Sequence, residues 1–262
     1  MLTKQEIRNG IDSVATFYDA ARPDYPSETV AWFFDQLGVR SGRKVLDIYC
    51  GTGRKLTTKL LLTGADVEAV EPGPRMRMEL AAVCPEVTVY DADAEALPLS
   101  DSSVDIVTVS QSFQWFETQQ VLTEIHRVLR PGGSLGVLYT RRCHTDPAQK
   151  GLAKILNSAM GTQGKFDWSE GRWRGILAGS PMFSAGNQSS TRFIFDCDEE
   201  QFVLHARSIG FVAAAGSDVQ TQVEQDARAF VKSKGGIVRL AYEAVAIATF
   251  RVPGAALDSR SS

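Results

Sequence analysis

Cysteine and histidine are scarce in this chain, and its charges nearly balance. The 262 residues include four widely separated cysteines, with no CxxC spacing, and only three histidines that could join them around a metal. We therefore expect no metal site and reduced thiols, as in a cytoplasmic protein. A formal net charge of -3 provides no field for gathering polyanions. Nucleic-acid binding is thus disfavoured, although Arg141 and Arg142 form a local basic pair.

Long apolar runs are also missing. Residues 1–6 lack the apolar core of a signal peptide, and no stretch approaches the roughly 20 apolar residues of a membrane span. We expect a soluble cytoplasmic protein without a membrane partner. The hydrophobic share of 44% and the charged share of 23% are those of an ordinary globular protein. A single domain over residues 1–262 is predicted, while the oligomeric state stays unknown.

Predicted strands and helices alternate along most of the chain. Apolar runs rich in valine and isoleucine predict strands at residues 45–48, 67–70, 87–90, 104–109, 134–139, 191–195 and 244–252. Helical spacing of apolar residues predicts helices over 56–64, 74–83 and 121–129. Strands that alternate with helices form a parallel sheet with right-handed crossovers. We therefore predict an α/β fold with a doubly wound, mostly parallel seven-stranded sheet.

The amino-terminal segment, residues 1–40, differs from this pattern. It is aromatic and contains Arg22-Pro23 and Tyr25-Pro26, which predicts helical pieces around a proline-stiffened bend. We expect this segment to pack on the cofactor-binding core, residues 41–140.

The carboxyl-terminal part is less regular. Residues 144–190 have a poor pattern and are expected to form an irregular insertion near the site. Residues 191–252 should complete the sheet, with one helix that starts at Asp198 and continues to Ile209, and another over 225–240. The last residues, 253–262, are expected to form a frayed tail.

The most specific pattern is a strand followed by a glycine turn. The strand at 45–48 leads to Gly51 and Gly53, and the next strand ends at Glu71, 18 residues after Gly53. In open parallel sheets, ligands bind beyond the carboxyl ends of the strands, where glycine lets the backbone approach and an acid accepts hydrogen bonds from a ribose diol. This order predicts a nucleoside-binding site. Glu71 could instead be an ordinary exposed acid at a strand end.

Ordered blocks along the chain match a known family. They are Tyr18–Pro26, Val45–Gly53, Val70–Pro72, Ala94–Leu99, Ser103–Asp105, Gln111–Phe116 and His126–Gly133. These blocks resemble the class I S-adenosylmethionine-dependent methyltransferases, and within them the type-11 group, which acts largely on small molecules. The resemblance implies a Rossmann-like fold with an amino-terminal helical lid and an insertion after the fifth strand. It also implies S-adenosylmethionine as cofactor and methyl transfer to an oxygen, nitrogen or carbon of a small organic acceptor.

The resemblance further implies a set of cofactor-binding residues. They are Asp47, Tyr49, Cys50, Gly51, Thr52, Gly53, Glu71, Pro72, Met76, Asp93, Ala94 and Ser110. In this set Glu71 would hold the ribose, the two glycines would face the methionine part, and Asp93 with Ala94 would face adenine. Asp47 would anchor the loop or reach the cofactor's amino group, although a purely structural role is equally open. Asp93 could also be a plain turn acid.

The same blocks supply candidates for the acceptor side of the site. Gln114 and Tyr18 are the catalytic candidates, and Tyr25, Phe113 and Trp115 are the substrate-binding candidates. Relatives often carry histidine where this chain has Gln114, and glutamine cannot act as a base near neutral pH. Gln114 could orient an acceptor that is already ionised, or it could only fill space. The aromatic side chains could equally be plain packing.

Tyr49 is the clearest departure from the family pattern. It stands where most relatives have the first glycine of a GxGxG turn, so its side chain could crowd the cofactor or swing aside. Together with Gln114, it motivates a second hypothesis, in which the fold is kept but the protein binds a ligand, or catalyses a cyclisation or rearrangement, without methyl transfer. The local sequence around Tyr49 also resembles that of RNA 5-methyluridine methyltransferases. The slightly acidic charge and the lack of a convincing catalytic cysteine disfavour an RNA substrate.

Overall fold

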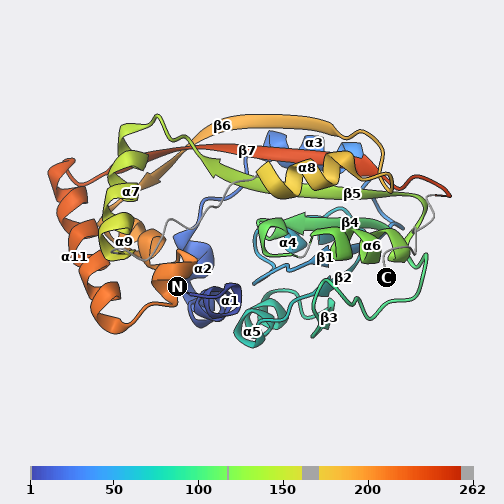
Figure 1. Ribbon diagram of the computed structural model, residues 1–262, viewed down its shortest axis with the longest axis horizontal. Helices are drawn as coiled ribbons and strands as arrows, with labels where there is room; N and C mark the ends of the chain where they lie inside the picture. Colours follow the sequence, from blue (N-terminus) through green and yellow to red (C-terminus); the bar gives the residue numbers. More distant parts are fainter. Residues whose placement is uncertain (1, 117, 161–170, 255–262) are drawn as a thin grey trace, which may run out of the picture.

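The seven strands form one sheet, in the order β3-β2-β1-β4-β5-β7-β6 (Figure 1). The computed structural model describes residues 2–116, 118–160 and 171–254. The strands are β1 (Lys44–Ile48), β2 (Asp66–Val70), β3 (Thr88–Tyr90), β4 (Val104–Ser110), β5 (Leu129–Arg142), β6 (Asn187–Cys197) and β7 (Val238–Phe250). The first five pair in parallel, and β7 runs antiparallel to both of its neighbours. The predicted doubly wound, mostly parallel seven-stranded sheet is confirmed.

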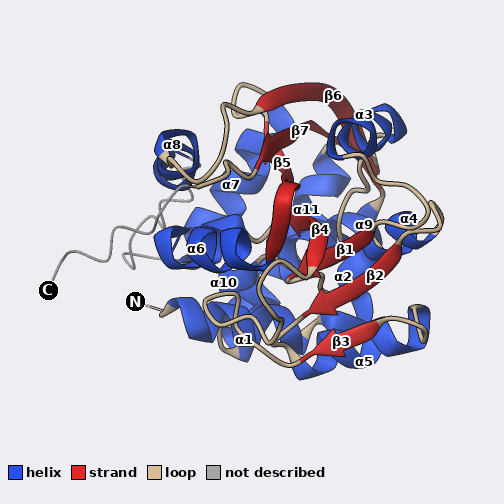
Figure 2. Cartoon of the chain, turned by 90° about the vertical axis from the view of Figure 1, so that its right-hand side faces the viewer, coloured by secondary structure: helices blue, strands red, loops and turns tan. Residues whose placement is uncertain are grey.

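Helices cover both faces of this sheet (Figure 2). They are α1 (Lys4–Ser13), α2 (Ala15–Ala21), α3 (Ser27–Leu37), α4 (Thr57–Leu61), α5 (Pro74–Val83), the 3-10 turn η1 (Phe113–Trp115), α6 (Thr118–Val128), α7 (Pro147–Met160), α8 (Gly171–Gly179), α9 (Glu199–Arg207), α10 (Gly210–Ala213) and α11 (Ser217–Ser233). Neighbouring side chains of a strand point to opposite faces. Val45 therefore joins one apolar core with Phe33 of α3, and Leu46 joins another with Leu122 of α6. None of the helices in the described part of the chain combines the length and apolar character of a membrane span.

A third apolar core lies at one end of the molecule. The strands β5, β6 and β7 are long and extend past β1 to β4 to reach α7, α9 and α11, at the left of Figure 1. Phe202 of α9, Val223 of α11 and Leu240 of β7 are buried together there. This helical end forms a second wall opposite the carboxyl ends of β1 and β4.

The amino-terminal helices bridge the two ends. As predicted, this segment forms helical pieces around a proline-containing bend: α2 follows α1 after one residue, and an extended stretch with the two prolines separates α2 from α3. Helix α1 packs against α10 through close backbone approach, because a Cβ on Gly10 would lie 2.5 Å from the backbone nitrogen of Ala214. Similarly, a Cβ on Gly210 would lie 2.5 Å from a methyl carbon of Ile7. The amino-terminal helix is thus attached to the carboxyl-terminal part of the chain.

Several predicted boundaries after residue 143 are wrong. The supposed irregular insertion contains α7 and α8, and β6 already begins at residue 187. The helix expected over 225–240 ends at residue 233, because Gly235 and Gly236 adopt positive φ and stop it. Strand β7 then starts at residue 238 instead of 244. Residues 161–170 of the insertion and 255–262 of the expected tail lie outside the described residues.

The helix predicted to start at Asp198 is confirmed, but its end is not. The Asp198 side chain accepts a hydrogen bond from the Gln201 backbone N–H and caps α9. The helix ends at Arg207, and Ile209 precedes the separate short helix α10.

Candidate active site

A cavity of about 750 Å³ lies where the carboxyl ends of β1, β2, β4 and β5 meet α1 and α2. Twelve of the seventeen predicted site residues line it. They are Tyr18, Tyr25, Tyr49, Cys50, Gly51, Thr52, Glu71, Pro72, Met76, Ser110, Gln114 and Trp115. The other five, which are Asp47, Gly53, Asp93, Ala94 and Phe113, do not appear in its wall. The fold thus gathers residues from four separate sequence blocks at one edge of the sheet.

Asp47 supports the site from inside the protein. Its side chain is 0% exposed, and its two oxygens accept hydrogen bonds from the hydroxyls of Thr57, at 2.7 Å, and Thr108, at 2.8 Å. Burial raises the pKa of this carboxyl to about 6, while the two hydroxyls oppose the rise. Both oxygens face the threonines, which supports the structural alternative, and contact of Asp47 with the amino group of a cofactor stays a prediction. The two hydrogen bonds connect β1 to α4 and β4.

Ala94 and Phe113 are likewise core residues. Both belong to the apolar core beside α6, and Phe113 is 1% exposed. The ring of Phe113 packs on Trp173, with 5.1 Å between centroids, and Trp173 itself lines the cavity. The structure thus places both behind the cavity wall, while the contacts of Ala94 with adenine and of Phe113 with substrate stay predictions. Phe113 supports a wall residue that the sequence pattern did not indicate.

The turn after β1 holds an unusual backbone. Gly51 and Gly53 have φ of 62° and 77°, and Tyr49 also has a positive φ, 54°. A Cβ on Gly53 would lie 2.1 Å from a Leu80 methyl carbon, so this glycine allows close packing of α5 below the turn. Gly51 faces the cavity, and a Cβ there would meet only the Met76 sulfur, at 4.0 Å. The turn therefore presents open backbone to a ligand.

The Tyr49 ring is held to one side of the turn. Its edge contacts Phe116, with 4.9 Å between centroids, and its hydroxyl donates to Asp93 Oδ1 at 2.8 Å. Arg8 of α1 donates to the same Asp93 oxygen at 2.8 Å and lies over the ring, 5.0 Å from its centroid. Non-glycine residues in the left-handed region carry a conformational cost of about 1 to 2 kcal/mol. These contacts offset that cost and connect α1 to the loop after β3.

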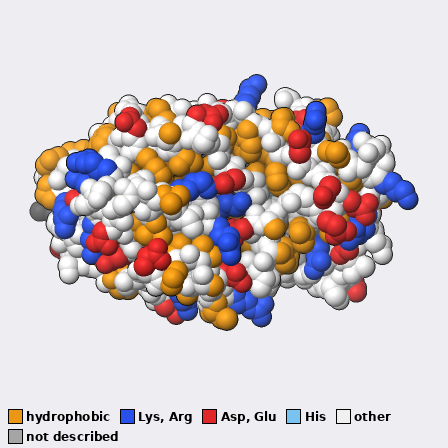
Figure 3. Space-filling model, turned by 180° about the vertical axis from the view of Figure 1, so that it is seen from behind, with side chains coloured by type: hydrophobic (Ala, Val, Ile, Leu, Met, Phe, Trp, Pro, Cys, Tyr) orange, Lys and Arg blue, Asp and Glu red, His pale blue; other side chains and the backbone are white. Residues whose placement is uncertain are grey.

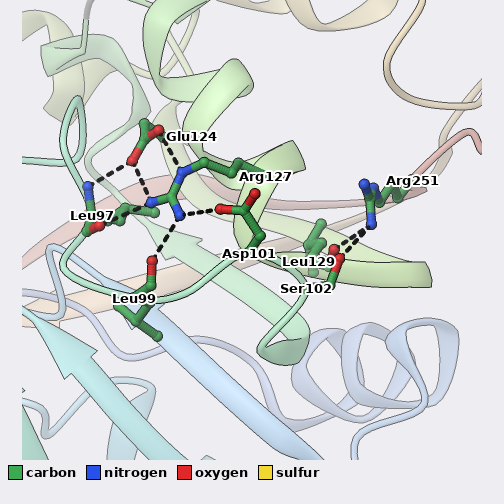
Figure 4. Close-up of polar contacts among 8 residues, drawn as sticks. All are labelled: Leu97, Leu99, Asp101, Ser102, Glu124, Arg127, Leu129 and Arg251. Atoms are coloured by element: carbon green, nitrogen blue, oxygen red, sulfur yellow. Dashed lines mark hydrogen bonds and ion pairs between the residues drawn. The ribbon is translucent and has the colours of Figure 1, made fainter. Parts of the chain in front are cut away.

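The loop after β3 is anchored to α6 (Figure 4). Arg127 donates to the carbonyl oxygens of Leu97, at 2.9 Å, and Leu99, at 2.7 Å. Its guanidinium also pairs with Glu124 and Asp101, both at 2.8 Å. These contacts join two of the blocks that matched the family pattern and hold the loop in which Asp93 lies.

Glu71 is the central acid of the cavity. Its side chain is 6% exposed, and its oxygens accept from the backbone N–H groups of Gly51, at 2.9 Å, and Gly73, at 2.8 Å. Burial raises the pKa of Glu71 to about 7, although the two N–H groups oppose the rise. A carboxylate offers about four acceptor sites. Two remain for donors of a ligand, which fits a ribose diol.

Asp12 of α1 closes the same end of the cavity. Helix α5 begins after Gly73, which has no side chain to cap it. Asp12 Oδ1 instead accepts from the backbone N–H groups of Arg75, at 2.9 Å, and Met76, at 3.0 Å. A cap supplied from another helix satisfies the free N–H groups at the start of α5. The position of α1 over Glu71 is thereby determined.

Asp19 is a site residue that sequence reasoning missed. Its Oδ2 accepts from the Thr52 hydroxyl at 2.5 Å, while its Oδ1 is buried without a hydrogen-bond partner in the described part of the chain. Lys55 donates to the carbonyl oxygens of Asp19, at 3.1 Å, and Arg22, at 2.9 Å, and so holds this stretch in place. A buried acceptor without a partner is costly. Its place beside the glycine turn suits a cationic ammonium group. The only sequence signal was its position in the Tyr18–Pro26 block.

The middle of the cavity is formed by β4 and its following turn. The hydroxyls of Tyr25 and Ser110 are hydrogen-bonded at 2.8 Å, and burial raises the pKa of Tyr25, so this hydroxyl stays protonated. Gln114 donates to the carbonyl oxygen of Gln111 at 2.7 Å. Gln111 has a positive φ of 60°, which turns that carbonyl toward η1. No group of three or more His, Cys, Asp or Glu side chains is arranged to hold a metal within residues 2–116, 118–160 and 171–254.

Comparison with known proteins agrees with this geometry. Residues 46–137 match a family model described as a methyltransferase domain. An uncharacterized methyltransferase of Mycobacterium tuberculosis is 39% identical over 140 residues. That alignment covers 53% of this chain and 56% of the relative, so the chain spans little more than half the length of the relative.

Two solved structures share the fold. The first is a geranyl diphosphate C-methyltransferase from Streptomyces coelicolor, solved with S-adenosyl-L-homocysteine, with a TM-score of 0.50, 15% identity, and coverage of 86% of this chain and 79% of the other. The second is the [4+2]-cyclase SpnF, with a TM-score of 0.53, 17% identity, and coverage of 89% and 84%.

The strand order, the glycine turn and the acid after β2 together define a Rossmann-like methyltransferase fold. Over residues 46–137 the chain matches the methyltransferase-domain family, and the relatives that align with about half of its length are named methyltransferases.

Proposed function

We propose that this chain transfers a methyl group from S-adenosylmethionine to an oxygen, nitrogen or carbon atom of a small organic acceptor. The observation that carries the proposal is the set of acceptor groups at one end of the cavity. Glu71 has two unused acceptor sites beside the open backbone of Gly51, and Asp19 Oδ1 is buried without a partner in the described residues. These groups match the ribose hydroxyls and the ammonium of the cofactor.

When bound, S-adenosylmethionine supplies an electrophilic methyl carbon on a sulfonium. An acceptor lone pair forms the new bond to that carbon, while the old carbon–sulfur bond breaks and its electron pair stays on sulfur. The residues of the chain align the two reactants and exclude water, which can lower a barrier by several kcal/mol. Thr52, Cys50, Met76 and Pro72 line the cofactor end.

The middle of the cavity and the wall beyond it suit the acceptor. Tyr18, Tyr25, Gln114 and Trp115 line the cavity there. The Gln114 amide is already a donor to the Gln111 carbonyl, so its own oxygen would orient an acceptor without removing a proton. We further propose that the chain works as one domain in which residues 1–40 act as a lid, since Asp12 and Arg8 of α1 contact both loops of the cofactor end.

A second candidate function is a cyclisation or rearrangement without methyl transfer. It is favoured by the likeness to the [4+2]-cyclase SpnF and by Gln114, which provides no base at the acceptor end. An RNA substrate is less favoured. On the face drawn in Figure 3, Lys and Arg side chains lie among Asp and Glu side chains instead of forming a continuous basic stripe.

Calorimetric titration of the purified chain with S-adenosylmethionine and S-adenosylhomocysteine tests the proposal. We expect micromolar binding of both, abolished or strongly weakened in Glu71→Ala. Methyl transfer is then measured with isotope-labelled cofactor and a panel of small acceptors. Binding without transfer to any acceptor favours the second candidate, whereas no binding of either ligand overturns the cofactor assignment.

A further inference from the structure

The charged side chains that line the cavity differ in whether they have an ion-pair partner. Three carboxylates line it, Asp12, Asp19 and Glu71, and all three belong to the cofactor end. Of the cations, Arg8 pairs with Asp93, Lys55 donates to backbone carbonyls, and Arg141 pairs with Glu243. Two further arginines, Arg22 and Arg142, also line the wall. Neither has an ion pair with any carboxylate of the described residues.

Arg22 is held with part of its guanidinium unsatisfied. It follows α2, and its Nη2 donates to the carbonyl oxygen of Ser208 at 2.7 Å. Its guanidinium lies over the Tyr18 ring, 5.3 Å from the centroid. The Nε is buried and has no hydrogen-bond partner among the described residues. An unsatisfied buried donor on a charged group is costly, so this guanidinium retains binding capacity for an acceptor atom.

A chain of hydrogen bonds fixes the neighbourhood of Arg22. The carbonyl oxygen of Ala21 can only accept, so the Nδ1 of His205, 2.8 Å away, is the donor. Burial and the two nearby arginines hold the pKa of His205 well below its usual range, and the ring is neutral. Its Nε2 therefore accepts from the Tyr242 hydroxyl at 2.8 Å. This chain ties the end of α2 to α9 and β7.

Arg142 at the end of β5 faces the same cluster. Burial lowers the pKa of Arg142, and the charge of Arg22 adds to the effect, whereas Tyr242 opposes it. Two half-buried cations thus lie near each other without an ion-paired carboxylate among the described residues. Such a pair is stabilised by an anion, and guanidinium groups bind carboxylate and phosphate oxygens in paired geometry.

We propose that Arg22 and Arg142 bind an anionic group, carboxylate or phosphate, on the methyl acceptor. This inference rests on the proposed function, because it names the substrate class of the same cavity. Tyr18, whose ring lies under the Arg22 guanidinium, and Trp173 also line the cavity and suit an apolar body on the acceptor.

The test uses the full chain saturated with S-adenosylhomocysteine and calorimetric titration of matched small probes. Phenylacetate, adipate and phenyl phosphate are compared with the neutral phenylacetamide. Variants are Arg142→Gln, Arg142→Lys and Arg22→Lys, and the control is Arg239→Gln, whose side chain is 76% exposed and pairs with Asp196. We expect the anions to bind and the amide not to, with about 10- to 100-fold weaker anion binding in Arg142→Gln. Arg142→Lys should lose less, and the control should be unchanged.

The outcomes separate this proposal from the proposed function. Loss of anion binding in Arg142→Gln with unchanged affinity for S-adenosylhomocysteine supports both, and the preferred probe distinguishes carboxylate from phosphate. If S-adenosylhomocysteine binds but the wild-type chain binds no anion, or binds the amide equally well, the anionic acceptor is overturned while the cofactor assignment stands. If S-adenosylhomocysteine itself does not bind, the proposed function fails first.

Discussion

Replacing Glu71 by glutamine should change how stability depends on pH. The ordinary pKa of this carboxyl is near 4.5 and rises to about 7 in the folded chain. Between these values the folded state binds more protons than the unfolded state, so the free energy of unfolding falls as the pH rises. The contribution of Glu71 to the free energy of unfolding is fully present below about pH 4.5 and is lost above about pH 7. At 1.36 kcal/mol per pKa unit, the difference between the two pKa values corresponds to about 3 kcal/mol in the free energy of unfolding.

Glu71→Gln removes this titration while keeping a side chain of the same size. We expect urea unfolding between pH 4.5 and 8 to show that the free energy of unfolding of the variant rises by about 3 kcal/mol relative to that of the wild type as the pH increases. Asp47, whose pKa is raised to about 6, titrates in both proteins and cancels in the comparison. The control is Glu86→Gln, which removes an exposed acid outside the cavity. Its curve should parallel that of the wild type.

The same substitution should alter cofactor binding. Ribose hydroxyls donate to the ionised carboxylate, so wild-type affinity for S-adenosylhomocysteine should rise as the pH passes through about 7. Glu71→Gln should bind more weakly by about 1 to 3 kcal/mol at pH 8, with little pH dependence. Parallel stability curves for Glu71→Gln and wild type would refute the buried, protonated carboxyl. A pH-independent wild-type affinity would refute the ribose contact.

Three further substitutions test the rest of the cavity. Asp19→Asn should weaken binding of S-adenosylmethionine about tenfold in calorimetry, because the ammonium loses a charged acceptor, and equal affinity would remove Asp19 from the site. Tyr49→Gly relieves the backbone strain but loses the contacts with Asp93 and Arg8, so cofactor affinity should fall, whereas tighter binding would mean that the ring obstructs the turn. In Gly73→Ala the new Cβ would lie 2.6 Å from Asp12 Oδ1, which should lower the free energy of unfolding in urea by about 1 to 3 kcal/mol; an unchanged midpoint would contradict the packing of α1 over the acid.

The parallel part of the fold was predictable because its signals are local. Each strand from β1 to β5 is an apolar run followed by a turn or helix signal, and the order alone implies the sheet. The later boundaries depend on tertiary packing. Residues of α7 become buried against α11 and β7, and the first residues of β7 pair with β6 from Cys197 onward. A single sequence contains no signal for such partners.

The candidate site was predictable to a similar extent. Glu71 and Gly51 follow from the strand, turn and acid order, and both line the cavity. Asp47 and Phe113 were placed near the site by their blocks, but which way a side chain points depends on neighbours such as Thr108 and Trp173. Asp19 was quoted only as part of a block, because an oxygen left without a partner is a property of the folded chain.

The attachment of α1 to α10 has a kinetic consequence. Through Gly10 and Ala214 the first helix moves with the carboxyl-terminal part of the chain, yet through Asp12 it closes the opposite end of the cavity over Glu71. An outward movement of α1 that admits the proposed cofactor would therefore also displace α10, which lines the same cavity. If α1 acts as the proposed lid, we expect entry and exit of the two ligands to be coupled, so that substitutions in α1 would change the order in which they bind and leave.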